Sequence, residues 1–126
     1  KLLRPVIGWL FPDAKNNKEA MDNISMNTIS NILGLGNAAT PAGIKAMESL
    51  NETNREKNKL SDSMLMLIVL NTTSLELIPT TVIAIRASLN ANSPASIIVP
   101  IWVSTIIGTL VGIISTKILI KRSKNK

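Results

Sequence analysis

The feature of the sequence that most constrains this chain is a long stretch with almost no charge. Between Asp62 and Lys117 lie 54 residues, of which only Glu76 and Arg86 carry charged side chains. A soluble helical domain distributes charge along every exposed helix face, whereas the hydrocarbon layer of a bilayer excludes charge. The stretch therefore predicts an all-α membrane protein with more than one membrane segment.

The last apolar run, residues 97–117, is predicted to be one regular transmembrane helix. Its first twenty residues are uncharged, and a helix of that length spans roughly the 30 Å hydrocarbon layer. From Lys117 onward the chain carries five basic residues and no acid. The positive-inside rule therefore assigns the tail, residues 118–126, to the cytoplasm.

Small residues recur at every fourth position of this predicted helix and form a stripe on one face. They are Ser104, Gly108, Gly112 and Thr116. Such a stripe allows another helix to approach closely. The approaching helix is either another segment of the same protein, which is the simpler interpretation, or a second subunit.

Residues 63–87 are long enough to cross a bilayer, but their centre is polar. The polar residues there are Asn71, Thr72, Thr73, Ser74 and Glu76, and Pro79 follows them. One interpretation is a tilted helix whose hydroxyl groups bond to its own carbonyls. The other is a broken transmembrane helix that lines a polar cavity. The number of polar residues favours the broken helix.

Residues 23–50 are predicted to form a re-entrant helical hairpin. Residues 23–44 are uncharged and are interrupted by GLGNAA at 34–39. Each arm has about ten residues, which is roughly half a bilayer as a helix. Gly34 and Gly36 permit a turn, and Thr40–Pro41 fits a helix N-cap followed by the first helical position. A hairpin that enters and leaves on one side keeps the basic N-terminal region and the tail in the cytoplasm together.

The hairpin tip and the broken helix are predicted to share one polar site at membrane depth. Irregular backbone is not exposed to lipid, so each break needs polar contacts. The candidate site residues are Asn37, Thr40, Asn71, Thr72, Ser74 and Glu76. For Asn37 and Thr40 the alternative is helix capping, and for Glu76 it is a shallow position beside water or Arg86. The runs NTIS (27–30) and NTTS (71–74) also match at three of four positions, each ahead of a break.

The composition excludes several classes of function. The chain has no His and no Cys, so it lacks the usual activated nucleophiles and thiolate zinc sites. We therefore expect no enzymatic activity, metal or cofactor. Three aromatic residues are too few for a surface that stacks bases, and the net charge of +6 fits membrane-proximal basic residues better than nucleic-acid binding.

Residues 1–12 are predicted to lie at the membrane surface, with Trp9 and Phe11 as anchors.

Two runs of the sequence carry a resemblance to a known family. They are NILGLGNAATPAGIKAMESL (31–50) and LNTTSLELIPTTVIAIRA (70–87). These runs resemble the spore maturation protein A family, integral membrane proteins of endospore-forming bacteria. That family is part of a wider group with the nucleoside-recognition, or Gate, domain. The resemblance covers essentially the whole chain and is strongest at GLGNAATP.

The resemblance implies a multi-pass plasma-membrane protein of sporulation, needed for spore maturation and core dehydration. It also implies the bilayer and the sister spore maturation protein B as partners, and no catalytic reaction. The chain begins with Lys1 inside an apolar stretch. We therefore expect residues 1–126 to be a single partial Gate domain whose N-terminal helices are missing.

The same wider group includes concentrative nucleoside transporters, whose hairpin reads roughly Gly-Gln-Thr-Glu-Ala-Pro. The run GNAATP at 36–41 keeps the Gly and the Pro, has Asn37 in place of Gln, and has Ala39 where the transporters have Glu. The resemblance thus carries over the scaffold better than the substrate. Two functions follow as expectations: a membrane pathway for a small solute or ion, or a non-transporting structural component of a spore membrane complex.

Overall fold

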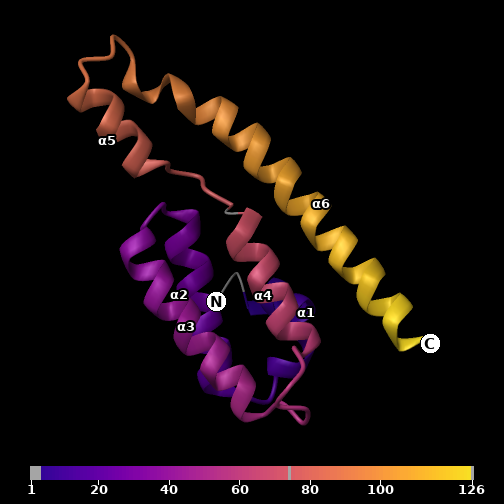
Figure 1. Cartoon of the computed structure of the whole chain (residues 1–126). Coiled ribbons are helices and arrows are strands. Elements are labelled where there is room, and N and C mark those ends of the chain that lie inside the picture. The colour runs from indigo at the N-terminus through magenta and orange to yellow at the C-terminus, as the bar shows by residue number, and fades with distance from the viewer. Residues whose placement is uncertain (1–3, 74, 126) are drawn as a thin grey trace.

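A computed structural model describes residues 4–73 and 75–125, and these residues are helical apart from short connections (Figure 1). The α-helices are α1 (Arg4–Leu10), α2 (Lys18–Ile32), α3 (Gly36–Glu52), α4 (Asp62–Thr73), α5 (Thr80–Ser88) and α6 (Ile98–Lys124). Two 3-10 turns, Pro12–Ala14 and Pro94–Ile97, precede α2 and α6. The predicted all-α class is confirmed.

Helices α2 and α3 form an antiparallel helical hairpin (Figure 1). At its open end Asn17 caps α2, because its side-chain oxygen accepts the Ala20 N–H at 3.0 Å, and its amide nitrogen donates to Ser49 O at 3.0 Å. Small buried residues line the helix–helix contact. They include Ala20, Ser30, Ala39, Ala42, Ala46 and Ser49. These short side chains allow the two helix backbones to lie close together.

The start of α3 differs from the prediction. The helix begins at Gly36, with Leu35 as its N-cap residue, so the predicted N-cap at Thr40 is wrong. Leu35 O accepts the N–H groups of Ala38 and Ala39, both at 2.9 Å, and these bonds close the first turn five residues earlier than expected. Pro41 then lies inside the helix, where its missing N–H removes one backbone hydrogen bond.

The second interruption divides the segment predicted to be a broken helix. Helix α4 ends at Thr73 and α5 begins at Thr80, with Pro79 as its N-cap residue. Because Pro lacks an N–H, it is well suited to the position before a helix. The helical break therefore falls where the polar residues are concentrated. Ser74 lies outside the described residues.

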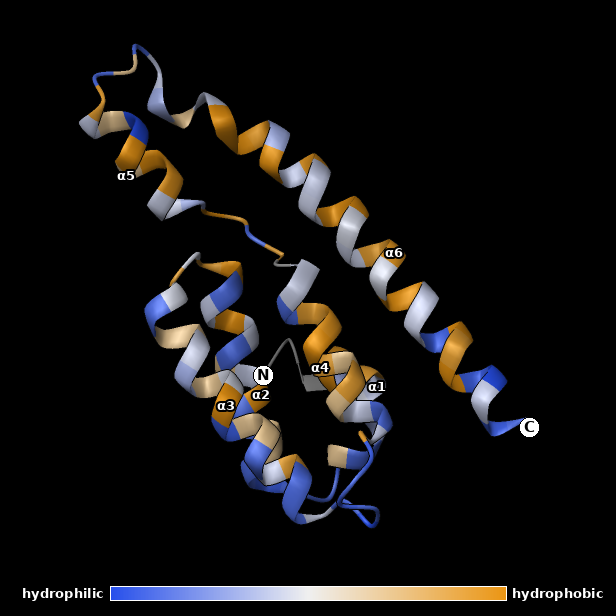
Figure 2. Ribbon diagram, viewed as in Figure 1, coloured by the Kyte–Doolittle hydropathy of each residue, from blue (hydrophilic) through white to orange (hydrophobic). Residues whose placement is uncertain are grey.

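Helix α6 lies alongside α4 (Figure 1). With the preceding turn it forms Pro94–Lys124, the one helix in the described ranges that is long and apolar enough to cross a membrane. Many of its apolar side chains are exposed, and Figure 2 colours most of the helix as hydrophobic or neutral. At its C-terminal end Lys117 donates to Trp9 O at 3.1 Å and lies 4.7 Å from the centre of the Trp9 ring. Lys124 forms an ion pair with Asp62.

The compact core lies where α1, the first 3-10 turn, α2, α3 and α4 meet. Its buried residues are Ile7, Leu10, Phe11, Ala14, Ala20, Ile24, Ala46, Leu50, Met64, Met66 and Leu67. Phe11 is fully buried there, so its predicted role as a membrane-surface anchor is wrong. Trp9 is 60% exposed and remains available at the surface. Helix α1 is thus held by one apolar face against the hairpin.

Candidate functional site

The two interruptions of the fold lie against each other. The N–H of Leu77, in the extended segment between α4 and α5, donates to Ile32 O at 2.8 Å at the end of α2. The hydroxyl of Thr80 donates to Gly34 O at 3.0 Å in the hairpin turn. Carbonyls at a helix C-terminus have no partner within the helix. Donors at the break between α4 and α5 therefore bond to the carbonyl groups that the hairpin turn leaves without partners.

Gly34 is required for this contact. Its φ of +65° lies in the left-handed region, and a Cβ atom there would lie 2.3 Å from Ile78 O and 3.1 Å from the Glu76 carboxylate. Only glycine fits both the backbone conformation and the space. Gly36 has neither constraint, because a Cβ there would meet nothing within 4 Å. The hairpin turn thus depends on the first of the two predicted glycines.

Three asparagines on α2 and α4, the helices that end at the two breaks, form a hydrogen-bonded cluster. The Asn71 side-chain oxygen accepts from the amide nitrogens of Asn27 and Asn31, each at 2.9 Å. The Asn27 nitrogen also donates to Ala39 O at 2.9 Å, and the Asn71 nitrogen donates to Leu67 O at 2.8 Å. The cluster therefore links α2, α3 and α4 directly. We call Asn27, Asn31 and Asn71 the asparagine cluster.

The sequence prediction included Asn71 but missed Asn27 and Asn31. A clue was present in the matched runs at 27–30 and 71–74, because their first residues, Asn27 and Asn71, bond to each other. Asn27 is only 2% exposed. A buried amide is expensive unless it is hydrogen-bonded, and a partly buried asparagine on a neighbouring helix is a natural partner.

Gly43 allows α3 to approach this cluster. A Cβ at this position would lie 2.9 Å from the Asn27 amide nitrogen and 3.9 Å from the Asn71 oxygen. The first distance is shorter than a Cβ normally tolerates. Glycine at position 43 therefore sets the spacing at which Asn27 reaches both Ala39 O and Asn71.

The asparagine cluster lies beside two cavities. An open pocket of about 610 Å³ lies between α2, α3 and α4, and its polar lining residues are Asn27, Asn31, Thr40, Asn71 and Thr72. A smaller, mainly apolar cavity of about 160 Å³ is lined by residues of α1, α2, α4 and α6, by Leu75, and again by Asn27 and Asn31. Because Asn27 and Asn31 line both, these two amides stand between the cavities.

Among the residues that the structure describes, none of those lining either cavity is ionisable. The nearby loop 53–61 is charged instead. There the Glu56 carboxylate accepts a hydrogen bond from Lys59 at 2.7 Å, and this bond and the carboxylate charge raise the pKa of Lys59. Across the described residues, no group of three His, Cys, Asp or Glu side chains is close enough to hold a metal ion. The chemistry available in the cavities is neutral hydrogen bonding.

The predicted site residues are only partly brought together. Thr40, Asn71 and Thr72 line the same open pocket, whereas Asn37 is exposed at the start of α3 and does not line it. Glu76 is half-buried beside the hairpin turn.

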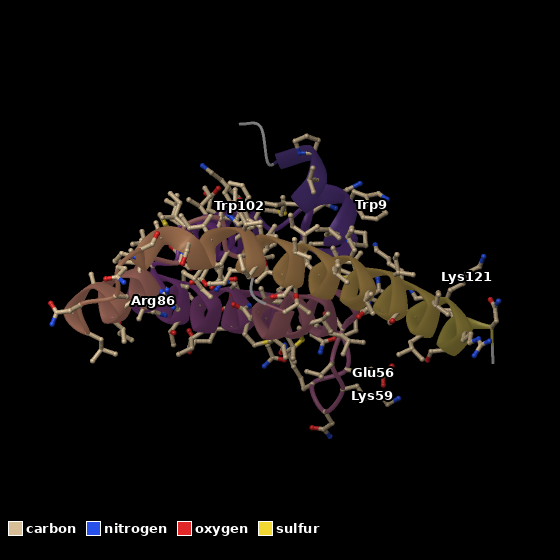
Figure 3. The ribbon with its side chains drawn as sticks, turned by 90° about the horizontal axis from the view of Figure 1, so that it is seen from above. Trp9, Glu56, Lys59, Arg86, Trp102 and Lys121 are labelled. Carbon is tan, nitrogen blue, oxygen red and sulfur yellow. The ribbon has the colours of Figure 1, made fainter. Side chains whose placement is uncertain are left out.

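Arg86 does not pair with Glu76. Its guanidinium donates to Pro94 O at 3.2 Å, to Ser93 O at 3.3 Å and to the Ser96 hydroxyl at 3.2 Å. Arg86 thereby holds the connection between α5 and α6, at the end of the molecule opposite Lys121 (Figure 3). A third contact at the break comes from α6, where the Trp102 ring nitrogen donates to Leu77 O at 2.7 Å.

Half of the predicted small-residue stripe packs within the chain. A Cβ on Gly112 would lie 3.0 Å from both Thr73 and Val69 of α4, and Thr116 is buried. Ser104 is exposed, and a Cβ on Gly108 would meet nothing within 4 Å. The contact face of α6 instead continues through Thr109, which is 6% exposed and donates to the Thr73 hydroxyl at 3.4 Å.

The part of the chain that the structure describes is therefore all-α, with one helix suited to a bilayer and two interrupted segments joined through polar contacts. The chain is homologous to spore maturation protein A of Bacillus subtilis (strain 168), with 40% identity over 126 residues. The match covers the whole of this chain and 64% of the length of that relative. No protein-family model matches the chain, and no solved structure is similar to it.

Proposed function

We propose that this chain is part of a plasma-membrane protein of sporulation that lines a pathway for a small solute or ion. The observation that carries the proposal is the meeting of the two interruptions at Gly34 and Leu77, next to the asparagine cluster. Interrupted helices that meet at membrane depth are the usual way in which membrane transporters expose polar backbone to a solute. The homologue's name supplies the sporulation context.

The proposal treats α2–α3 as a re-entrant hairpin. The uncharged part of α2, from Asn23 to Ile32, is about 15 Å long, roughly half the hydrocarbon layer. Charged residues of both arms, from Lys18 to Asp22 and from Lys45 to Glu52, lie at the open end, away from the turn. These lengths suit a segment that enters to mid-depth and returns.

The charged ends of the other helices support the same orientation. Lys124 at the end of α6 pairs with Asp62 at the start of α4, and the Asp13 carboxylate accepts hydrogen bonds from Ser63. In Figure 2 the hairpin base, the loop 53–61 and the end of α6 are all strongly hydrophilic. In our proposal this is the cytoplasmic end, with α4–α5 and α6 each crossing the membrane.

Cysteine labelling tests this topology. The chain has no native Cys, so single substitutions can be read without background. A thiol at Ser61 should react only from the cytoplasmic side, and one at Asn92 only from outside. Reaction of position 61 from outside would overturn the re-entrant hairpin.

A non-transporting role is the second candidate. It is favoured by the asparagine cluster itself, whose amide nitrogens donate to acceptors within the chain. In this case the polar contacts hold the scaffold together for assembly with a partner such as spore maturation protein B, and no solute passes.

Solute flux separates the two candidates. The full-length protein is reconstituted in liposomes, with and without spore maturation protein B. A pathway predicts flux above that of empty liposomes, and it predicts that Asn71→Leu lowers this flux while Asn92→Leu, in the α5–α6 connection, does not. Folded, correctly oriented protein without flux in either preparation would favour the structural role.

A further inference from the structure

The orientation of the asparagine cluster is fixed by main-chain carbonyls. Ala39 O and Leu67 O only accept hydrogen bonds, so the groups that face them are the amide nitrogens of Asn27 and Asn71. The Asn71 oxygen must then face Asn27 and Asn31, and both supply their nitrogens to it. All three amides are thereby oriented without ambiguity.

In this orientation, two side-chain oxygens of the cluster receive no hydrogen bond from the described residues. Among the described residues, no hydrogen-bond donor reaches the side-chain oxygens of Asn27 and Asn31. No fully enclosed side-chain oxygen or nitrogen in the same residues lacks a partner, so these two oxygens keep some accessible surface, and the residues that carry them line both cavities. Asn27 is otherwise almost completely buried. The cluster thus presents two preorganised acceptors between the cavities.

The surroundings of these oxygens disfavour an ion. Within residues 4–73 and 75–125, no carboxylate or basic group lines either cavity, and a charge without a partner is costly to remove from water. Gly36, the first residue of α3, lines the open pocket. The positive end of the α3 dipole therefore lies near the pocket and adds a further penalty for a cation.

We propose that the asparagine cluster binds a small uncharged solute whose N–H or O–H groups donate to the side-chain oxygens of Asn27 and Asn31. This inference rests on the proposed pathway and names the class of solute that it accepts. The open pocket of about 610 Å³ is within the usual range for small-molecule sites. The cavity of about 160 Å³, which Asn27 and Asn31 also line, has room only for small molecules.

The test compares neutral and charged probes on the full-length protein in liposomes. Urea and xylitol are the uncharged donor-bearing probes, and rubidium and chloride are the ionic ones. The wild type should carry the uncharged probes at least about tenfold faster than empty liposomes and should carry neither ion. Faster flux of rubidium or chloride than of urea would overturn the inference and leave the proposed pathway standing. Absence of flux for every probe would overturn both.

Variants at Asn31 link the selectivity to the cluster. Asn31→Leu should lower urea flux about tenfold, the effect of one lost hydrogen bond of about 1.4 kcal/mol. Asn31→Asp should lower urea flux similarly and admit rubidium, because it adds a carboxylate. Asn23→Leu is the matched control, since Asn23 lies on the same helix and lines neither cavity. Urea flux unchanged in folded Asn31 variants, as judged by their melting temperatures, would overturn the inference.

Discussion

The hairpin region and α6 are held in place by different kinds of interaction. In the hairpin region, α2, α3, α4 and the extended segment after α4 are tied by specific hydrogen bonds from Asn27, Asn31, Leu77 and Thr80. In α6, only Thr109 and Thr116 are buried, and most apolar side chains are exposed. The first region specifies its own geometry, whereas the apolar face of α6 has few contacts within the described part of the chain. Substitutions in the first should therefore be costly even in detergent, and those on the outer face of α6 should not.

The largest effect is expected at the hairpin turn. Gly34→Ala should reduce the free energy of unfolding by about 3 kcal/mol, because it combines left-handed backbone with a clash against Ile78 O. Chemical denaturation of the purified full-length protein measures this. Gly36→Ala is the control and should be neutral or slightly stabilising, since the added methyl meets no atom. Equal loss in both variants would show that the turn contact is not specific.

A smaller effect is expected at the helix crossing beside the asparagine cluster. Gly43→Ala should cost about 1–2 kcal/mol, because its methyl displaces the Asn27 amide from Ala39 O or Asn71. The same denaturation experiment applies, with Gly108→Ala of α6 as the control in open space. A neutral Gly43→Ala would mean that α3 and Asn27 are not in close contact.

The two central glycines of the α6 stripe should differ from each other. Gly112→Leu should destabilise the protein by about 2 kcal/mol through overlap with Thr73 and Val69, while Gly108→Leu should change stability by less than about 0.5 kcal/mol. Melting temperatures of the two variants in detergent give the comparison. If Gly108→Leu is the more damaging of the two, the open half of the stripe is packed against another helix.

The smallest expected effect is at the contact between α1 and the end of α6. Trp9→Leu should cost about 0.5–1 kcal/mol, because it removes the ring beneath the Lys117 ammonium. A double-mutant cycle with Lys117→Gln isolates the interaction between the two side chains. Additive effects in the cycle would show that the contact contributes no coupling energy.

The sequence predicted the features that depend on local composition. The uncharged run of α6, the turn at Gly34 and the helical break after Thr73 each follow from residue types that are adjacent in the chain. The features that it missed depend on partners far apart in sequence. Asn31 and Asn71 are separated by 40 positions, and the burial of Phe11 depends on how α1 packs against the hairpin.

Two detailed predictions differed from the structure for local reasons. Thr40–Pro41 has the residue types of a helix start, but Leu35 O had already closed the first turn. The predicted stripe on α6 takes every fourth residue, whereas an α-helix has 3.6 residues per turn, so the stripe drifts away from the buried face. The buried face therefore passes from Thr116 and Gly112 to Thr109, and Gly108 lies beside that face without packing against another helix.

The central claim is that the two interruptions meet, and disulfide crosslinking between positions 32 and 77 tests it most directly. Leu77 N lies 2.8 Å from Ile32 O, and a disulfide forms only when two Cα atoms are within about 7 Å. Ile32→Cys with Leu77→Cys should crosslink under mild oxidation in membranes, whereas Ile32→Cys with Ile107→Cys, on the exposed face of α6, should not. Failure of the first pair to crosslink, with both thiols reactive to maleimide, would contradict the account.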